Sequence, residues 1–155
     1  SALTSARIEP ESPYLAVHVH GWGLAQETPK KLAKQLSAAL DRIRAESDLK
    51  ICFVTMAKSD KKTISLVTDG MKEDFHIVKS GRDIDVTIGT IRSAELCISM
   101  KHHPLIFAMG GAVPAVALVM ENDDYYLHKN KGALEIFGQE DLLLQCSIEE
   151  INDLL

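Results

Sequence analysis

The chain has 155 residues, of which 46% are hydrophobic and 25% are charged, and its formal net charge is -5. This length allows one domain with a substantial core, and the composition is ordinary for a soluble globular protein. Without a broad basic field, the chain is not expected to bind nucleic acid. No apolar run approaches the roughly 20 residues that span a membrane, and no signal-peptide pattern is present, so we expect a cytoplasmic protein that is not integral to a membrane.

Elements with strand-like and helix-like patterns alternate along the chain. Residues 1–13 are polar and are interpreted as a linker or a remnant of cloning, and residues 14–155 as a single domain. Strands are predicted at 14–20, 50–56, 75–78, 95–99, 114–120 and 142–144. Helices are predicted from 27 or 28 to 43, at 59–70, 84–91, 101–109 and 124–137, and from 147 onward. Alternation of this kind predicts a three-layer Rossmann-like α/β domain with a mainly parallel sheet and helices on both faces.

The fourth predicted strand runs into a polar turn that carries a lysine and two histidines. Ser99 ends the strand, Lys101, His102 and His103 follow, and an apolar helix begins. Ligands bind at the carboxyl ends of parallel strands, and helix N-termini attract anions. The turn therefore predicts an anionic substrate and proton transfer, with Lys101 and His102 binding substrate and His103 as acid or base. Ser99 is expected either to cap the helix or to contact the ligand.

A second group of candidates follows the first predicted strand, at the same edge of the sheet. His20 is a candidate catalytic residue, Gly21 permits close approach of backbone or ligand, and Trp22 could form a wall of a cleft. His18, inside the strand, is interpreted as a core or interface histidine. Residues 129–131 are interpreted as a solvated helix face.

Cysteine and histidine spacing gives no sign of a metal site. Cys52, Cys97 and Cys146 lie far apart among apolar neighbours and are expected to be buried, reduced thiols. The tightly spaced pair His102 and His103 would point about 100° apart on a helix, so the two rarely share a metal.

Three consecutive stretches follow a recognisable pattern: Ser99–His103, Pro104–Ala108 and Ala112–Pro114, the last leading into a valine-rich strand. They resemble the polysaccharide pyruvyl transferase family, which typically shows Ser-x-Arg-x-His, then Ala-Leu-Ile-Phe-Ala, then Gly-x-Pro. Residues 129–132 and 137–138 are similar to the tail of that family. The resemblance spans about residues 94–138.

This resemblance implies the carboxyl-terminal half of a two-domain enzyme of the glycosyltransferase-B architecture, with the amino-terminal half as a missing partner. Such enzymes transfer a pyruvyl group from phosphoenolpyruvate to a sugar of an exopolysaccharide or cell-wall polymer, and the scheme needs no metal or cofactor. By position, Lys101 replaces the family arginine that binds the donor, and His103 matches the family histidine. His20 stands where the family tends to have another arginine. Neither departure keeps the planar fork of N–H donors that arginine offers, so the resemblance implies that the donor or the activity would differ here.

Two further interpretations stay open. The first is a glycosyltransferase or sugar-nucleotide epimerase half that uses a diphosphate donor, in which Glu121 or Asp123 after the fifth strand would bind a ribose. The second is a non-catalytic binding or assembly domain, which the departures from the family arginines favour.

Overall fold

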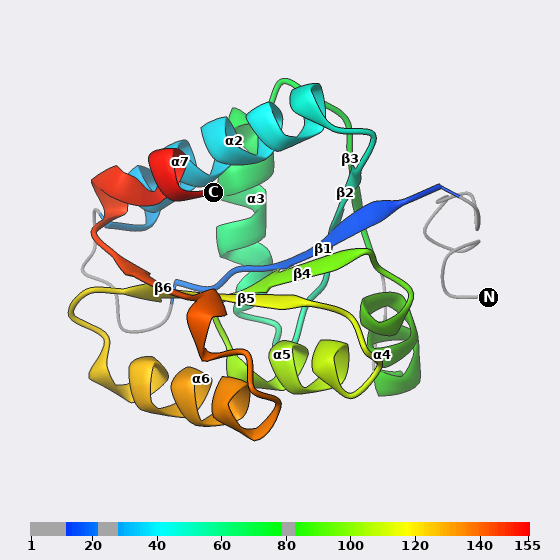
Figure 1. Ribbon diagram of the computed structural model, residues 1–155. Helices are drawn as coiled ribbons and strands as arrows, with labels where there is room; N and C mark the ends of the chain where they lie inside the picture. Colours follow the sequence, from blue (N-terminus) through cyan, green and yellow to red (C-terminus); the bar gives the residue numbers. More distant parts are fainter. Residues whose placement is uncertain (1–11, 22–27, 79–82) are drawn as a thin grey trace.

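Six parallel strands form one sheet in the order β3-β2-β1-β4-β5-β6, as the computed structural model of the chain shows for residues 12–21, 28–78 and 83–155 (Figure 1). Much of the predicted linker, and Trp22, lie outside these described residues. The strands are β1 (Tyr14–His18), β2 (Lys50–Phe53), β3 (Phe75–Ile77), β4 (Leu96–Ser99), β5 (Ala115–Met120) and β6 (Leu143–Cys146).

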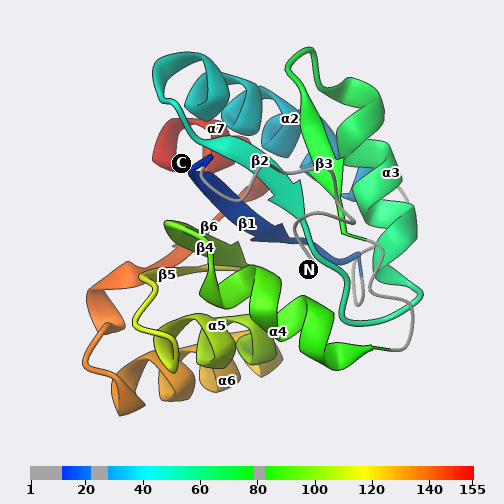
Figure 2. The ribbon, with the colours of Figure 1, turned by 90° about the vertical axis from the view of Figure 1, so that its right-hand side faces the viewer.

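Helices cover both faces of this sheet, which confirms the predicted three layers. One layer contains α2 (Thr28–Glu46), α3 (Asp60–Gly70) and α7 (Ile151–Leu154), and the other contains α4 (Ile84–Arg92), α5 (His102–Met109) and α6 (Asp124–Ile136) (Figures 1 and 2). Two short 3-10 helices, η1 (Glu140–Leu142) and η2 (Ile148–Glu150), flank β6. Among the described residues, no helix is both long and apolar enough to cross a membrane.

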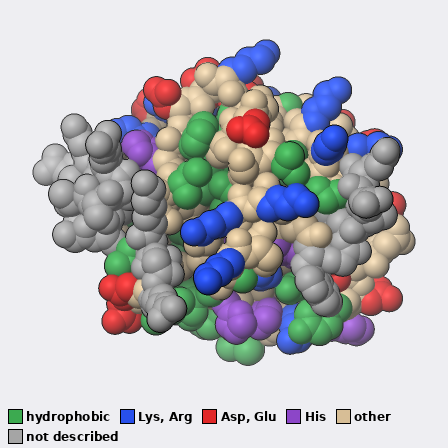
Figure 3. All heavy atoms as spheres, turned by 180° about the vertical axis from the view of Figure 1, so that it is seen from behind, with side chains coloured by type: hydrophobic (Ala, Val, Ile, Leu, Met, Phe, Trp, Pro, Cys, Tyr) green, Lys and Arg blue, Asp and Glu red, His purple; other side chains and the backbone are tan. Residues whose placement is uncertain are grey.

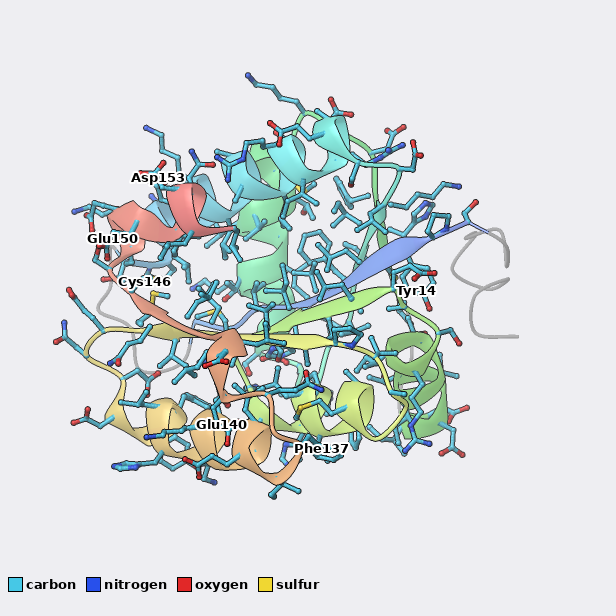
Figure 4. The ribbon with its side chains drawn as sticks, viewed as in Figure 1. Tyr14, Phe137, Glu140, Cys146, Glu150 and Asp153 are labelled. Carbon is cyan, nitrogen blue, oxygen red and sulfur yellow. The ribbon has the colours of Figure 1, made fainter. Side chains whose placement is uncertain are left out.

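The central strands are continuous apolar runs because helices cover them on both sides. Every residue of β1 is buried, and the apolar side chains of the sheet contribute to two core clusters, which contain Tyr14 and Leu15 respectively. The Tyr14 hydroxyl donates a hydrogen bond to the Thr90 carbonyl of α4, and Cys146 ends β6 at the other side of the sheet (Figure 4). All three cysteines are free and buried, as predicted.

Several predicted elements end a few residues away from their observed bounds. β1 ends at His18 rather than at residue 20, and β2 ends at Phe53 rather than at residue 56. The pairing with the neighbouring strands stops at the same points, since His18 pairs with Ser99 at the end of β4 and Phe53 pairs with Ile77 at the end of β3. Past α6, Gly138 has a φ of +64°, the left-handed conformation that makes glycine common after a helix.

The carboxyl ends of the strands point toward one side of the molecule. In Figure 2 the arrowheads of β1 and β2 point to the right, and this side faces the viewer in Figure 3. Lysine and arginine side chains gather in the middle of that face, with histidines below them (Figure 3). His20 and Lys101, which follow β1 and β4, therefore lie at this edge of the sheet.

Candidate functional site

The sheet order creates a topological switch point between β1 and β4. The chain leaves β1 through α2 toward β2 on one side, and leaves β4 through α5 toward β5 on the other. His18, the last residue of β1, lies opposite Ser99, the last residue of β4. Because the two connections diverge here, such a point is where open α/β sheets bind ligands. The predicted turn at residues 99–103 begins at this position.

Asp60, the first residue of α3, has a buried carboxylate that contacts His18 at the end of β1 and Lys101 just after β4, the two strands of the switch point. Its Oδ2 accepts hydrogen bonds from His18 Nε2 at 3.1 Å and from the backbone N–H groups of Met56 at 2.9 Å and Ala57 at 2.8 Å. Its Oδ1 accepts a hydrogen bond from Lys101 Nζ at 2.9 Å. One side chain therefore joins the end of β1, the β2–α3 loop and the β4–α5 turn.

The carboxylate of Asp60 is ionised. Burial alone would raise its pKa, but hydrogen bonds from His18, Lys101 and the Met56 backbone outweigh burial and hold the pKa below its ordinary value. A carboxylate with four donors is well satisfied even though the side chain is fully withdrawn from solvent.

His18 is buried, as expected for a core histidine, but it belongs to this polar cluster. Because an ionised carboxylate can only accept, the ring donates from Nε2, and Nδ1 is a buried nitrogen with no partner among the described residues. Burial chiefly lowers the pKa of His18, although Asp60 acts in the opposite direction. The ring therefore has one nitrogen still able to accept a hydrogen bond.

His20 lies beside this cluster and is also buried. Its ring centroid is 6.1 Å from that of His18 and 4.6 Å from that of Tyr126 on α6. Burial first, and then the neighbouring His18 and Lys101, lower the pKa of His20 to about 4. The imidazole is consequently neutral at pH 7, and it lies behind Tyr126 rather than at the protein surface.

The β4–α5 turn is held by hydrogen bonds from several directions. Ser99 Oγ donates to the Lys101 carbonyl at 2.7 Å and accepts from the Lys101 N–H at 3.1 Å. The Met100 N–H donates to the His18 carbonyl, and the Met100 carbonyl accepts from Asn130 Nδ2 at 3.2 Å. Lys101 itself is the N-cap residue of α5, and no side chain caps this helix. Ser99 therefore shapes the turn and does not cap the helix.

The two histidines of the turn begin α5 and stack on each other. Their ring centroids are 4.0 Å apart, and the His103 ring lies 6.4 Å from that of Phe107. His103 is exposed, whereas His102 is half-buried, and burial followed by His103, Lys129 and Lys101 lowers the pKa of His102. The described contacts of His103 thus lie on α5, while Lys101 turns inward to Asp60.

Asn130 corrects the interpretation of residues 129–131 as a solvated face. Lys129 and Lys131 are exposed, but Asn130 is fully buried on the inner face of α6, one turn after Tyr126. Its Nδ2 supports the β4–α5 turn, and its Oδ1 is a second buried acceptor with no partner among the described residues. A single polar residue between two lysines gave no sequence signal for this orientation.

Gly21 has a structural reason to be glycine. A Cβ at this position would lie 2.8 Å from Thr63 Oγ1 on α3, which is closer than real contacts allow. Thr63 is buried, so its hydroxyl has little room to move. The close approach predicted for Gly21 thus includes an approach to the Thr63 side chain of α3.

The two carboxylates proposed to bind a ribose, Glu121 and Asp123, differ in their local contacts. Asp123 caps α6, since its side chain accepts a hydrogen bond from the Tyr126 N–H at 3.0 Å. Glu121 is exposed, and its backbone N–H donates to the Cys146 carbonyl. Asp123 is thus already engaged in the local fold.

A separate cavity of about 550 Å³ lies between α2 and α3. Its lining includes Lys30, Lys34, Ser37, Asp41 and Lys72, and it contains none of the side chains that contact Asp60. Across the described ranges, no three His, Cys, Asp or Glu side chains are grouped so that they could hold a metal ion.

Asp60 is a site residue that was not predicted from the sequence. The pattern around it was interpreted only as the start of a helix, because serine and aspartate commonly begin helices. The available signal was its place after β2, since the carboxyl ends of parallel strands meet at one edge. A carboxylate there can face a lysine that follows another strand.

The fold and site define a Rossmann-like α/β domain that holds a lysine at the head of a helix at its topological switch point. The family model described as polysaccharide pyruvyl transferase matches residues 3–122, and the chain belongs to this family. The match includes Asp60 and the β4–α5 turn and ends before α6. Searches of the curated proteins and of the solved structures find no match. The family is one of transferases, and its description indicates a saccharide substrate.

Proposed function

We propose that this chain binds phosphoenolpyruvate at the β4–α5 turn and takes part in transferring its pyruvyl group to a sugar. The observation that carries the proposal is Lys101, which stands at the N-terminus of α5 at the switch point of a pyruvyl transferase family member. An ammonium group and the first N–H groups of a helix both attract a phosphate or a carboxylate. Phosphoenolpyruvate carries one of each.

The proposed reaction forms a ketal. A proton adds to the methylene carbon of phosphoenolpyruvate, and one sugar hydroxyl attacks the neighbouring carbon. A second hydroxyl of the same sugar then attacks that carbon, the carbon–oxygen bond to phosphate breaks, and inorganic phosphate leaves. One hydroxyl proton balances the proton added to carbon, and the other leaves with phosphate. The scheme needs groups that give and accept protons beside an anion site.

His103 is the proposed acid or base. It is exposed in the first turn of α5, two residues after Lys101, where a bound donor would reach it. His20, the other catalytic candidate, is neutral above a pKa of about 4 but buried behind Tyr126. Because His20 is buried and His103 is exposed, His103 is the better candidate for contact with the sugar. His102, Ser99, Gly21 and Trp22 remain proposed substrate-binding residues.

A second domain is part of the proposal. In this proposal the enzyme has the glycosyltransferase-B architecture that the family resemblance implies, its active site lies between two domains, and this chain supplies the face that carries Lys101. The sugar would then be bound largely by the other domain, so we expect donor binding without turnover from the chain alone. An added amino-terminal domain should restore turnover.

The rival interpretations differ from this one in the ligand. A nucleotide-sugar donor would need a carboxylate for its ribose, and the capping role of Asp123 leaves Glu121 as the remaining candidate. A non-catalytic module is favoured by the pairing of Lys101 with Asp60, which compensates the charge of this lysine inside the protein. The three interpretations therefore differ in which anion, if any, they predict to bind at the β4–α5 turn.

A ¹H–¹⁵N NMR titration tests the proposal. Phosphoenolpyruvate should shift the amide signals of residues 100–103, and a nucleoside diphosphate sugar should shift them less. Lys101→Met should abolish the shifts, whereas Lys131→Met, which removes an exposed lysine of α6, should preserve them. Shifts confined to another surface, or a stronger response to the nucleotide sugar, would contradict the proposed function.

A further inference from the structure

We propose that Asp60 is a positioning residue of the donor site, whose buried carboxylate holds the Lys101 ammonium at the head of α5. The inference rests on the proposed function, because it concerns the lysine that would bind the donor. It goes further by assigning a role to a residue outside the turn, 41 positions earlier in the chain.

The two oxygens of Asp60 have different partners. Oδ2 accepts from His18 and from the backbone of the β2–α3 loop, so it serves the local fold. Oδ1 accepts from Lys101 Nζ at 2.9 Å and has no other printed partner within the described part of the chain. The contact with Lys101 can therefore be removed while the other three hydrogen bonds are kept.

Lys101 needs such a partner because its positive charge lies at the positive end of the α5 dipole. The positive end of a helix dipole lies at the N-terminus, so a cation there is repelled, and no side chain caps α5. A lysine side chain also has four flexible carbon atoms that let the ammonium move into water. In the structure its side chain is instead only 14% exposed and points to Asp60, whose side chain is fully buried. The buried carboxylate supplies the attraction that keeps the cation at this helix end.

The pairing leaves donors for a ligand. An ammonium group carries three N–H donors, and Asp60 takes one of them. His18 and His20, which lie nearby, have pKa values lowered by burial and are neutral, so Lys101 is the cation of this cluster. A bound anion would therefore share the ammonium with Asp60, and its position would be set by the carboxylate behind it.

The first test reads the position of the lysine without any ligand. An ammonium held by a buried carboxylate exchanges its protons slowly, so its ¹⁵Nζ signal should be visible in the wild-type protein at neutral pH. Asp60→Asn should abolish this signal, because an amide oxygen can keep the three hydrogen bonds of Oδ2 while its NH₂ group faces the lysine. A signal unchanged in a folded Asp60→Asn variant would overturn the proposal.

The second test is a double-mutant cycle on phosphoenolpyruvate affinity. Asp60→Asn should weaken binding about tenfold and Lys101→Met at least as much, and the double variant should bind no more weakly than Lys101→Met alone. Additive effects would mean that Asp60 does not act through Lys101, and unchanged or tighter binding by Asp60→Asn would also overturn the proposal. A wild-type chain that binds no phosphoenolpyruvate contradicts the proposed function, and the ¹⁵Nζ signal then decides on Asp60 by itself.

A third measurement covers the case in which Asp60→Asn fails to fold. The ¹³C signal of the Asp60 carboxyl group reports its titration in the presence of the intact side chain. Lys101→Met should move this titration to higher pH, whereas Lys131→Met should not. A titration that is the same in all three proteins would show that the two groups are not coupled.

Discussion

The ring of His20 packs against the ring of Tyr126 with their centroids 4.6 Å apart, and this contact joins the chain after β1 to the first turn of α6. His20 is 2% exposed, and its pKa falls from an ordinary 6.5 to about 4, first because of burial and then because of His18 and Lys101. The folded protein thus holds this histidine neutral across a range in which an unfolded chain would protonate it.

The pH dependence of stability follows from this difference. Between pH 6.5 and 4 the unfolded state binds more protons at this site, so the free energy of unfolding rises with pH in this window. Acidification from 6.5 to 4 should remove on the order of 3 kcal/mol, at 1.36 kcal/mol for each pKa unit. His20→Phe should flatten this slope in urea titrations at several pH values, and the exposed His128→Phe should not. An equal slope in wild type and His20→Phe would show that another group is responsible.

The fold could be predicted from the sequence because each element carries its own local signal. The stripe of Leu32, Leu36 and Leu40 identifies α2, and the run of small and branched apolar residues at 115–120 identifies β5. Strand ends were placed less well, since the length of a strand depends on its neighbours in the sheet.

The site could be predicted only in part, because long-range pairs leave no local signal. The turn at residues 99–103 was found from one continuous stretch. The contact of His18 with Asp60 joins residues 42 positions apart, and that of Asn130 with Met100 joins residues 30 apart. Such pairs become visible only when the strand order is known, since this order decides which loops meet.

Asn130 should contribute to stability out of proportion to its size. Asn130→Ala removes the hydrogen bond to the Met100 carbonyl and leaves that buried acceptor without its side-chain donor. We expect a loss of about 1–3 kcal/mol in the free energy of unfolding, measured by urea denaturation. The neighbouring Lys131→Ala should change stability by less than about 0.5 kcal/mol, because its side chain is exposed. Equal effects at the two positions would contradict the anchoring role.

Gly21→Ala should destabilise the protein, since the new Cβ would lie 2.8 Å from Thr63 Oγ1. Overpacking of this kind typically costs about 1–3 kcal/mol, and Thr63→Ala should restore part of the loss by making room. Gly89→Ala is the matched control, because a Cβ there meets nothing within 4 Å inside α4 and should stabilise the helix by roughly 0.5–1 kcal/mol. The comparison needs only thermal or urea unfolding. If Gly21→Ala left the free energy of unfolding unchanged, the predicted clash with Thr63 would be wrong.

His103→Ala should lower turnover of the complete two-domain enzyme far more than it lowers stability. The side chain is exposed, so its loss leaves no buried cavity, whereas loss of a positioned acid or base typically costs on the order of 10²–10⁴ in rate. His128→Ala, also exposed and on α6, is the control. Initial rates of phosphate release from phosphoenolpyruvate with a sugar acceptor provide the measurement. Near-normal turnover of His103→Ala would transfer the acid–base role to His20 or to the other domain.

Lys101 gives the sharpest comparison, because its partner is known. Lys101→Arg should keep or improve donor binding, since a guanidinium can donate to Asp60 and still offer a planar pair of N–H groups to phosphate or carboxylate. Lys101→Glu should abolish binding, and it should also destabilise the fold by placing a second carboxylate beside Asp60.

Lys101→Gln separates these two effects, because it removes the positive charge without adding a negative one. Donor affinity should be measured at one fixed salt concentration, since exposed charges are screened by ions, and the amide spectrum of each variant should confirm its fold. We expect affinity to fall in the order arginine, lysine, glutamine and glutamate, with the first two close together. Equal affinity for all four side chains would mean that the anion is not held at this turn, and the binding-module interpretation would then account better for the pairing of Lys101 with Asp60.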